Sequence, residues 1–170
     1  MIKQLKPNVV QISFEAFGSC VYLIKLKDKF IMIDTGSPDT VTELKQALEN
    51  LNIKREDISC VIITHFHYDH VGGLVLLRKI PVYASSKDFG ENVIDIKELK
   101  IPDLRIIETP GHSKGSISLL YEDILFSGDT LFNDGIHGRT DLPGGSDEEM
   151  KKSLEKLSKL NYKILAPGHI

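Results

Sequence analysis

The sequence predicts a single α/β domain in which several strand ends gather at one rim of a sheet sandwich. Short runs rich in β-branched and aromatic residues alternate with segments of helical periodicity. Five of the six histidines lie at or just beyond the end of a predicted strand. A chain of 170 residues with 41% apolar residues is long enough for one core, so we expect residues 1–170 to form one domain.

The charge and cysteine content of the sequence argue against several classes of binding partner and cellular location. The 21 basic and 24 acidic residues are spread along the chain and give a net charge of −3, which argues against a nucleic-acid surface or a membrane-binding patch. A small-molecule substrate is expected, and the oligomeric state is left open. Cys20 and Cys60 are too few for a disulfide framework. With no signal peptide or membrane-spanning run evident, we expect a cytoplasmic protein.

The N-terminal third contains three predicted strands and one helix. The strands are Val9 to Phe14, Cys20 to Lys27 and Phe30 to Ile33. Asp34 follows the third strand directly, and a carboxylate there needs partners. It either orients a metal ligand through hydrogen bonds or caps its own Thr-Gly turn. Ser37 and Pro38 predict the start of a helix that carries apolar residues at helical spacing as far as Leu51.

The next predicted strand, Cys60 to Thr64, leads into His65-Phe66-His67-Tyr68-Asp69-His70. His65 and His67 share one side of an extended segment, because side chains alternate along a strand. Asp69 and His70 follow at the turn into a short helix expected to begin near Val71. The histidine pair can hold one divalent metal, and Asp69 with His70 can hold a second.

The C-terminal half repeats this placement of polar residues after strands. The predicted strands are Val82 to Ala84, Leu104 to Glu108, Ser116 to Tyr121, Ile124 to Phe126 and Tyr162 to Ala166, with a helix capped by Ser146, while residues 85–103 allow only brief structure. His112, Asp129 and His169 each follow one of these strands. His112 would complete the ligand set of the first metal, and Asp129 can bridge two cations.

A long loop at residues 131–146 has the length of a functional segment. Arg139 in this loop and Lys114 are candidate anchors for an anionic substrate. The alternative for Arg139 is an ion pair with Asp141 that only stiffens the loop.

The histidine and aspartate motifs, together with Pro110-Gly111-His112, Ser127-Gly128-Asp129 and Pro167-Gly168-His169, resemble the metallo-β-lactamase-fold superfamily. The resemblance implies a four-layer αββα sandwich with the metals at one edge of the sheets. It also implies two divalent ions, most simply zinc, with iron or manganese as alternatives. By motif, the first metal is bound by His65, His67 and His112, the second by Asp69, His70 and His169, and Asp129 bridges them.

The segment from Gly138 to Ser146 is similar to that of the glyoxalase II-like (hydroxyacylglutathione hydrolase-like) group. The likeness does not extend to the helical C-terminal domain with which glyoxalase II holds glutathione, so the thiol of the substrate is left open. His169 is the penultimate residue of the sequence. We therefore expect the second metal to depend on a segment that can fray.

These features predict a hydrolase of small acyl thioesters that uses Asp69 together with a metal-bound hydroxide. Two cations sharing a water lower its pKa from about 15.7 towards 7. One alternative is a persulfide dioxygenase of the same subgroup, which would use a single Fe(II) held by His65, His112 and Asp129. Another is a non-catalytic binding module that the metal only stabilises.

Overall fold

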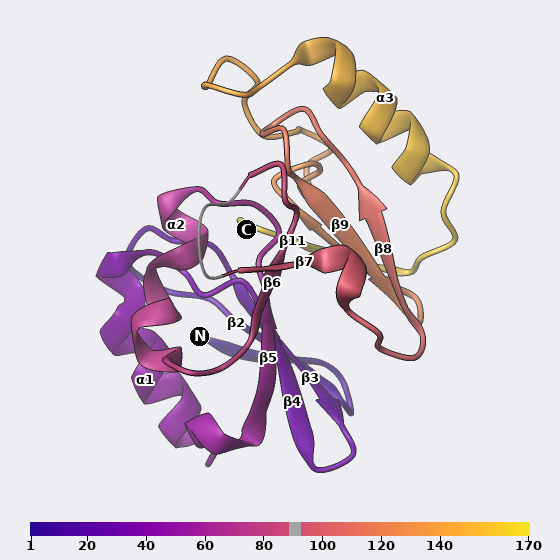
Figure 1. Cartoon of the computed structure of the whole chain (residues 1–170). Coiled ribbons are helices and arrows are strands. Elements are labelled where there is room, and N and C mark those ends of the chain that lie inside the picture. The colour runs from indigo at the N-terminus through magenta and orange to yellow at the C-terminus, as the bar shows by residue number, and fades with distance from the viewer. Residues whose placement is uncertain (89–92) are drawn as a thin grey trace.

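The computed structural model describes residues 1–88 and 93–170 and contains two β-sheets packed face to face (Figure 1). Helices cover the outer face of each sheet, so the layers follow in the order helix, sheet, sheet, helix (Figure 1). The predicted αββα sandwich and its single-domain organisation are confirmed.

The first sheet has seven strands that lie side by side in sequence order. Neighbouring strands are antiparallel from β1 to β4 and parallel from β4 to β7. The strands are β1 (Ile2–Lys6), β2 (Val9–Ile12), β3 (Val21–Leu26), β4 (Lys29–Ile33), β5 (Ile58–Ile62), β6 (Val82–Ala84) and β7 (Ile94–Asp95). Since β4 and β5 run parallel, the residues that follow them meet at one edge of the sheet.

Short helices fill the connections on the outer face of this sheet. They are η1 (Pro38–Thr40), α1 (Val41–Asn50), η2 (Arg55–Asp57), α2 (Tyr68–Val71) and η3 (Gly72–Leu77). The apolar face of α1 buries Leu44 and Leu48 against Met32 and Val61 of the sheet. Burial of this stripe, rather than intrinsic helix propensity, stabilises a helix of only ten residues.

The second sheet has four strands in the order β11-β10-β9-β8. They are β8 (Leu104–Glu108), β9 (Ile117–Tyr121), β10 (Ile124–Gly128) and β11 (Ile164–Pro167), and η4 (Ile96–Glu98) lies between the sheets in sequence. Helix α3 (Asp147–Ser158) packs Leu157 against Ile107 and Leu125 on the outer face. No helix in residues 1–88 or 93–170 is both long and apolar enough to cross a membrane.

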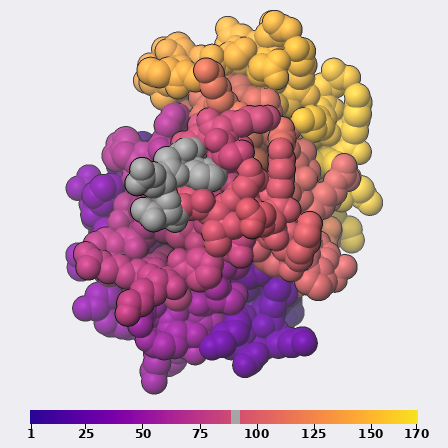
Figure 2. All heavy atoms as spheres, in the orientation of Figure 1, coloured from indigo at the N-terminus to yellow at the C-terminus, as the bar shows by residue number. Residues whose placement is uncertain are grey.

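The main core lies between the two sheets and contains buried residues from both. Tyr22 of the first sheet meets Phe126 of the second edge to face, with ring centroids 5.1 Å apart. Cys20 and Cys60 are buried free thiols, in agreement with the absence of a disulfide framework expected from the sequence. The orange and yellow C-terminal part sits directly on the magenta N-terminal part in the space-filling view of Figure 2.

The structure differs from the sequence predictions most clearly in β1, in the start of the helix after Ser37 and in the start of α2. Strand β1 was not predicted, because its alternation of Lys and apolar residues is short and lies at an exposed edge. The helix after Ser37 begins as the 3-10 turn η1, in which the Ser37 hydroxyl accepts a hydrogen bond from the Asp39 amide. Helix α2 begins at Tyr68, three residues before the predicted start, so Asp69 and His70 lie within it.

Candidate metal centre

Three histidine rings from two separate loops converge at the edge of the sandwich. The Nε2 atoms of His65 and His112 lie 3.1 and 2.8 Å from Nδ1 of His67. His112 Nδ1 lies 2.7 Å from the Arg139 carbonyl oxygen, to which it donates. That bond leaves the Nε2 lone pair of His112 directed at the other two rings. The structure therefore brings together the three histidines predicted for the first metal.

A second group lies beside the first and consists of Asp69, His70 and His169. Asp69 Oδ2 is 3.2 Å from His169 Nε2. Asp129 lies between the two groups, because its Oδ2 is 3.5 Å from both His112 Nε2 and His169 Nε2. A carboxylate in this position suits the predicted bridge between two cations.

Two buried polar atoms of the site lack hydrogen-bond partners in the described part of the protein, which favours a bound metal ion. His70 Nε2 and Asp129 Oδ1 are buried, lie 3.3 Å apart and have no hydrogen-bond partner among the described residues. Buried polar atoms of this kind cost free energy unless something binds them. Gly168 keeps the space open, because a Cβ atom there would lie 2.1 Å from Asp129 Oδ1. Imidazole nitrogens and carboxylate oxygens are ligands that zinc and iron accept.

Burial and neighbouring charges divide the histidines into two kinds. Burial lowers the pKa of His65 well below its usual value, and the His70 ring reinforces this shift. Burial would also lower the pKa of His70, but Asp34 and Asp129 outweigh it and raise this pKa to about 10. In the same way, Asp129 and Asp69 raise the pKa of His169 to about 9. The pKa of His65 is thus lowered, whereas the pKa values of His70 and His169 are raised.

Asp34 supports the centre from the end of β4. Its Oδ1 accepts a hydrogen bond of 2.7 Å from the Thr64 amide, and its Oδ2 accepts one of 2.7 Å from the Thr64 hydroxyl. The same Oδ2 lies 2.8 Å from His70 Nδ1, which donates to it. These contacts suit a carboxylate that orients a ligand, which is one of the two alternatives considered from the sequence. Asp34 reaches them with φ at +55°, a left-handed conformation that Asp tolerates better than most residues.

The segment that carries His169 is held in place. The Gly168 amide donates to the Gly128 carbonyl at 2.8 Å, and the Cys20 amide donates to the Gly168 carbonyl at 2.6 Å. The Phe17 ring stacks on the His169 ring with centroids 5.4 Å apart. This segment of the chain is therefore anchored on both sides, which opposes the fraying expected from its place in the sequence.

Asp88 is a functional candidate that sequence reasoning missed. Its Oδ2 accepts hydrogen bonds of 2.9 Å from the Phe66 amide and from the Ser113 hydroxyl. Its Oδ1 accepts a bond of 3.3 Å from the Gly115 amide. Asp88 thus ties the loop of His65 and His67 to the loop of His112. The predicted polar stretch 85–103 gave no signal for this role, and residues 89–92 of that stretch lie outside the described residues.

The centre opens into a cleft of about 570 Å3. The cleft is lined by Phe17, His67, Tyr68, Asp69, His112, Asp129, Phe132, His137, Gly138, Arg139, Leu142 and His169. Arg139 binds Asp141 with two bonds of 2.8 Å, which is the ion pair considered as the alternative to substrate anchoring. Lys114 lies in a different hollow with Gly144 and Ser146. Neither candidate anchor is therefore placed as a free cation in the cleft.

A two-sheet sandwich with clustered histidines and aspartates at one edge defines a class of metalloprotein. Residues 15–88 and 79–169 match the model of the metallo-beta-lactamase superfamily. The chain belongs to this superfamily, whose fold binds divalent metals.

Curated relatives include hydrolases. A probable metallo-hydrolase of Methanocaldococcus jannaschii is 36% identical over 143 residues, which is 82% of this chain and 70% of the relative. A hydroxyacylglutathione hydrolase of Idiomarina loihiensis is 35% identical over 79% of this chain and 53% of its own length. An atrochrysone carboxyl ACP thioesterase of Aspergillus fumigatus is 29% identical over 97% of this chain and 56% of its own length. The relatives that act on thioesters are thus much longer than the region that matches.

One solved structure, that of TTHA1623 in a di-iron-bound form, has the same fold. It superimposes with a TM-score of 0.81 at 24% identity and covers 94% of this chain and 91% of the other. At this level of identity the match shows the fold alone.

Proposed function

We propose that this chain is a dinuclear metal hydrolase that cleaves small acyl thioesters. The observation that carries the proposal is the arrangement of two ligand groups around Asp129, which lies 3.5 Å from a histidine of each group. We assign the first cation to His65, His67 and His112, and the second to Asp69, His70 and His169. Zinc suits these nitrogen and oxygen donors, and iron or manganese are the alternatives.

Two divalent cations, when bound, supply a water of lowered pKa as nucleophile and polarise the carbonyl that it attacks. The chain itself fixes the donor atoms before substrate arrives. His112 and His70 each donate from Nδ1, to the Arg139 carbonyl and to Asp34 respectively, so both rings present Nε2 to the centre. We assign Asp69, which lines the cleft, the role of holding a proton of the attacking water at a carboxylate oxygen.

A thioester suits this centre because its leaving group requires little help. A thiolate whose conjugate acid has a pKa of about 8.5 departs without full protonation by a general acid. The nitrogen of an amide and the alkoxide of an ordinary ester are far stronger bases and need a proton from a general acid in order to leave. The proposal therefore favours thioesters over peptides, and it draws support from the thioesterase and hydroxyacylglutathione hydrolase among the relatives.

The test is metal analysis of the purified protein combined with a panel of small thioesters. We expect turnover of thioesters that is lost on chelation and restored by about two equivalents of zinc. Oxygen consumption with a persulfide substrate and one iron per chain would instead identify the mononuclear dioxygenase. Stabilisation by metal without turnover of any thioester or persulfide would identify a binding module.

A further inference from the structure

Three aromatic side chains line the cleft beside the metal centre, and two of them contact the His169 ring. Phe17 and Tyr68 remain 63% and 61% exposed, although both are large and mainly apolar. Their ring centroids are 6.4 Å apart, and Phe132 meets the His169 ring with centroids 6.2 Å apart. We call Phe17, Tyr68 and Phe132 the aromatic wall. All three line the same cleft as the ligand-type residues.

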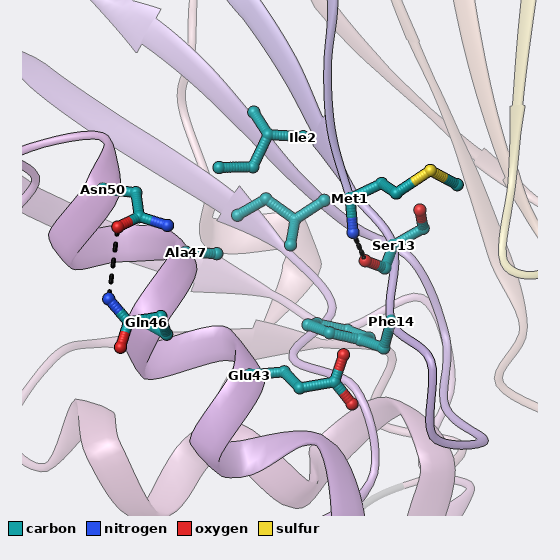
Figure 3. A pocket seen from close by; sticks show the side chains of 9 residues that line it. Met1, Ile2, Ser13, Phe14, Glu43, Gln46, Ala47 and Asn50 are labelled. Carbon is teal, nitrogen blue, oxygen red and sulfur yellow. Dashed lines mark hydrogen bonds between the residues drawn. The ribbon is translucent and has the colours of Figure 1, made fainter.

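The chain holds Phe17 in this exposed position. Glu43 of α1 accepts hydrogen bonds of 2.8 and 3.1 Å from the amides of Glu15 and Ala16. Figure 3 shows Glu43 reaching from α1 towards the segment that follows Phe14. The Ser37 hydroxyl donates to the Phe17 carbonyl at 2.5 Å. Phe17 is therefore presented to the cleft by a fixed backbone, which lowers the ordering cost of binding an apolar group there.

The same cleft offers no unpaired cation for a remote anionic group. Among the described residues that line it, Arg139 is the one lysine or arginine. Arg139 donates from Nε and Nη2 to the two carboxylate oxygens of Asp141, at 2.8 Å each, so its charge is already paired. Lys114 lines a hollow of its own. A thioester that carries carboxylates far from the reacting carbonyl would meet apolar rings in place of a charged partner.

We propose that the cleft selects neutral thioesters whose apolar acyl chain lies on the aromatic wall, in preference to anionic glutathione thioesters. The inference rests on the proposed thioester hydrolysis. The acyl chain begins at the reacting carbon, and the wall begins at His169 of the metal centre, so an acyl chain reaches the wall directly. A fully buried methylene contributes about 0.8 kcal/mol, and each methylene in this half-open cleft should raise kcat/KM about two- to threefold.

The first test uses zinc-loaded protein and three substrates. S-hexanoyl-N-acetylcysteamine and S-acetyl-N-acetylcysteamine share a neutral thiol, and S-hexanoylglutathione shares the longer acyl group. We expect kcat/KM to be about 15- to 80-fold higher for the hexanoyl than for the acetyl compound, which has four fewer methylenes, and higher for the neutral than for the anionic hexanoyl thioester. Equal values for the two acyl groups, or a preference for the glutathione thioester, would overturn the proposal.

Variants separate the wall from the metal centre. Tyr68→Ala and Phe17→Ala should each reduce the preference for hexanoyl over acetyl several-fold. Val75→Ala, at a side chain that is 54% exposed outside the cleft, should keep the wild-type preference. A general loss of activity from metal or folding damage would lower both rates equally and leave the ratio unchanged. An unchanged ratio in both wall variants would therefore reject the aromatic wall as the acyl site.

Variants at Arg139 and Asp141 test whether an unpaired cation in the cleft would favour the anionic substrate. Asp141→Asn frees the guanidinium, so we expect the rate with S-hexanoylglutathione to rise relative to that with the neutral hexanoyl thioester. Arg139→Ala should change both rates by the same factor, because the paired side chain recognises neither substrate. A selective loss with glutathione thioesters in Arg139→Ala would show that the arginine is an anchor and contradict the proposal.

Binding of a thioether, which cannot be hydrolysed, measures the preference of the cleft independently of the proposed reaction. In calorimetric titration, the thioether S-hexyl-N-acetylcysteamine should bind more tightly than S-hexylglutathione, and Phe17→Ala should weaken its binding. If the neutral thioether binds more tightly but no thioester is hydrolysed, the preference of the cleft for neutral ligands is supported and the proposed thioester hydrolysis is rejected. Equal or tighter binding of S-hexylglutathione rejects the preference. So does sedimentation showing a dimer that Phe17→Ala and Tyr68→Ala dissociate, because the wall would then be buried against a second copy of the chain.

Discussion

At the scale of single residues, the pKa values of the histidines determine how strongly protons compete with a metal for each ring. His70 and His169 have pKa values raised to about 10 and about 9, because carboxylates around them outweigh the effect of burial. A metal ion must displace a proton from each ring before it can bind there. His65 requires no such displacement, because burial lowers its pKa. The two ligand groups should therefore respond differently to pH.

Metal binding to the group of Asp69, His70 and His169 should strengthen as pH rises. Both rings are protonated below their raised pKa values, so competition by protons weakens as pH rises from about 6.5 to about 8.5. Calorimetry in buffers of different ionisation enthalpy should detect about two protons released with the second equivalent of zinc near pH 7. Affinity for the second equivalent that does not change over this range would contradict the assignment.

Asp34 should matter for metal affinity more than for folding. Asp34→Asn weakens the acceptor for His70 Nδ1 and places an amide against the Thr64 amide. Loss of such a partner of a ligand costs about 10- to 100-fold in metal affinity. Competition with a chromophoric chelator measures this loss, and Asp39→Asn, at an exposed position in η1, serves as the matched control. Equal affinities in the two variants would show that Asp34 only shapes its turn.

Among the structural elements, the loops that follow the strands determine the geometry of the centre. The loop after β5 carries His65 and His67, and the turn after β8 carries His112. Asp88 joins these two loops, since it accepts hydrogen bonds from Phe66 and Ser113. Within residues 1–88 and 93–170, the hydrogen bonds of Asp88 go to backbone amides and a serine hydroxyl, so any effect on the centre would act through the loops.

Asp88→Ala should loosen the turn that carries His112. The buried Ser113 hydroxyl and the Gly115 amide would lose an acceptor, and the loss of such an acceptor costs about 1–3 kcal/mol. We expect a lower thermal midpoint and a lower affinity for the first zinc. Differential scanning calorimetry and zinc titration measure the two effects, with Asp28→Ala in the exposed turn before β4 as control. Zinc affinity equal to that of the control would reject the linking role.

The periodicity of apolar residues in the sequence predicts most of the strands and helices. The short histidine and aspartate motifs predict the candidate metal ligands. Periodicity located β8 at Leu104–Glu108 and the hairpin of β9 and β10, because apolar runs are bounded by clear turn residues. It placed the start of α2 too late, since the metal-loop sequence has little apolar periodicity. Asp88 was missed because its partners are 22 to 27 residues away in sequence, and a single sequence carries no signal of such contacts.

At the scale of the whole molecule, the proposed metals would join the two sheets. His65, His67, Asp69 and His70 follow the first sheet's β5, whereas His112, Asp129 and His169 follow strands of the second sheet. The main core already packs the sheets together through residues such as Tyr22 and Phe126. Bound cations would add links at the rim, where the sandwich is otherwise open to the cleft.

Removal of metal should therefore lower the stability of the entire sandwich. A ligand at a concentration of 1,000 times its dissociation constant stabilises a fold by about 4 kcal/mol. Chemical denaturation of chelated and zinc-loaded protein should show a difference of this order. Phe126→Ala should cost about 3–5 kcal/mol in both forms, because it removes a fully buried ring. An identical midpoint with and without zinc would show that the metal does not link the sheets.

The proposed two-cation centre is tested most directly by anomalous diffraction from crystals of the zinc-loaded protein. Two peaks about 3.5–4 Å apart are expected. One should be bounded by His65, His67 and His112, and the other by Asp69, His70 and His169, with Asp129 contacting both. The absence of any peak at these residues, or a metal bound elsewhere on the chain, would contradict it.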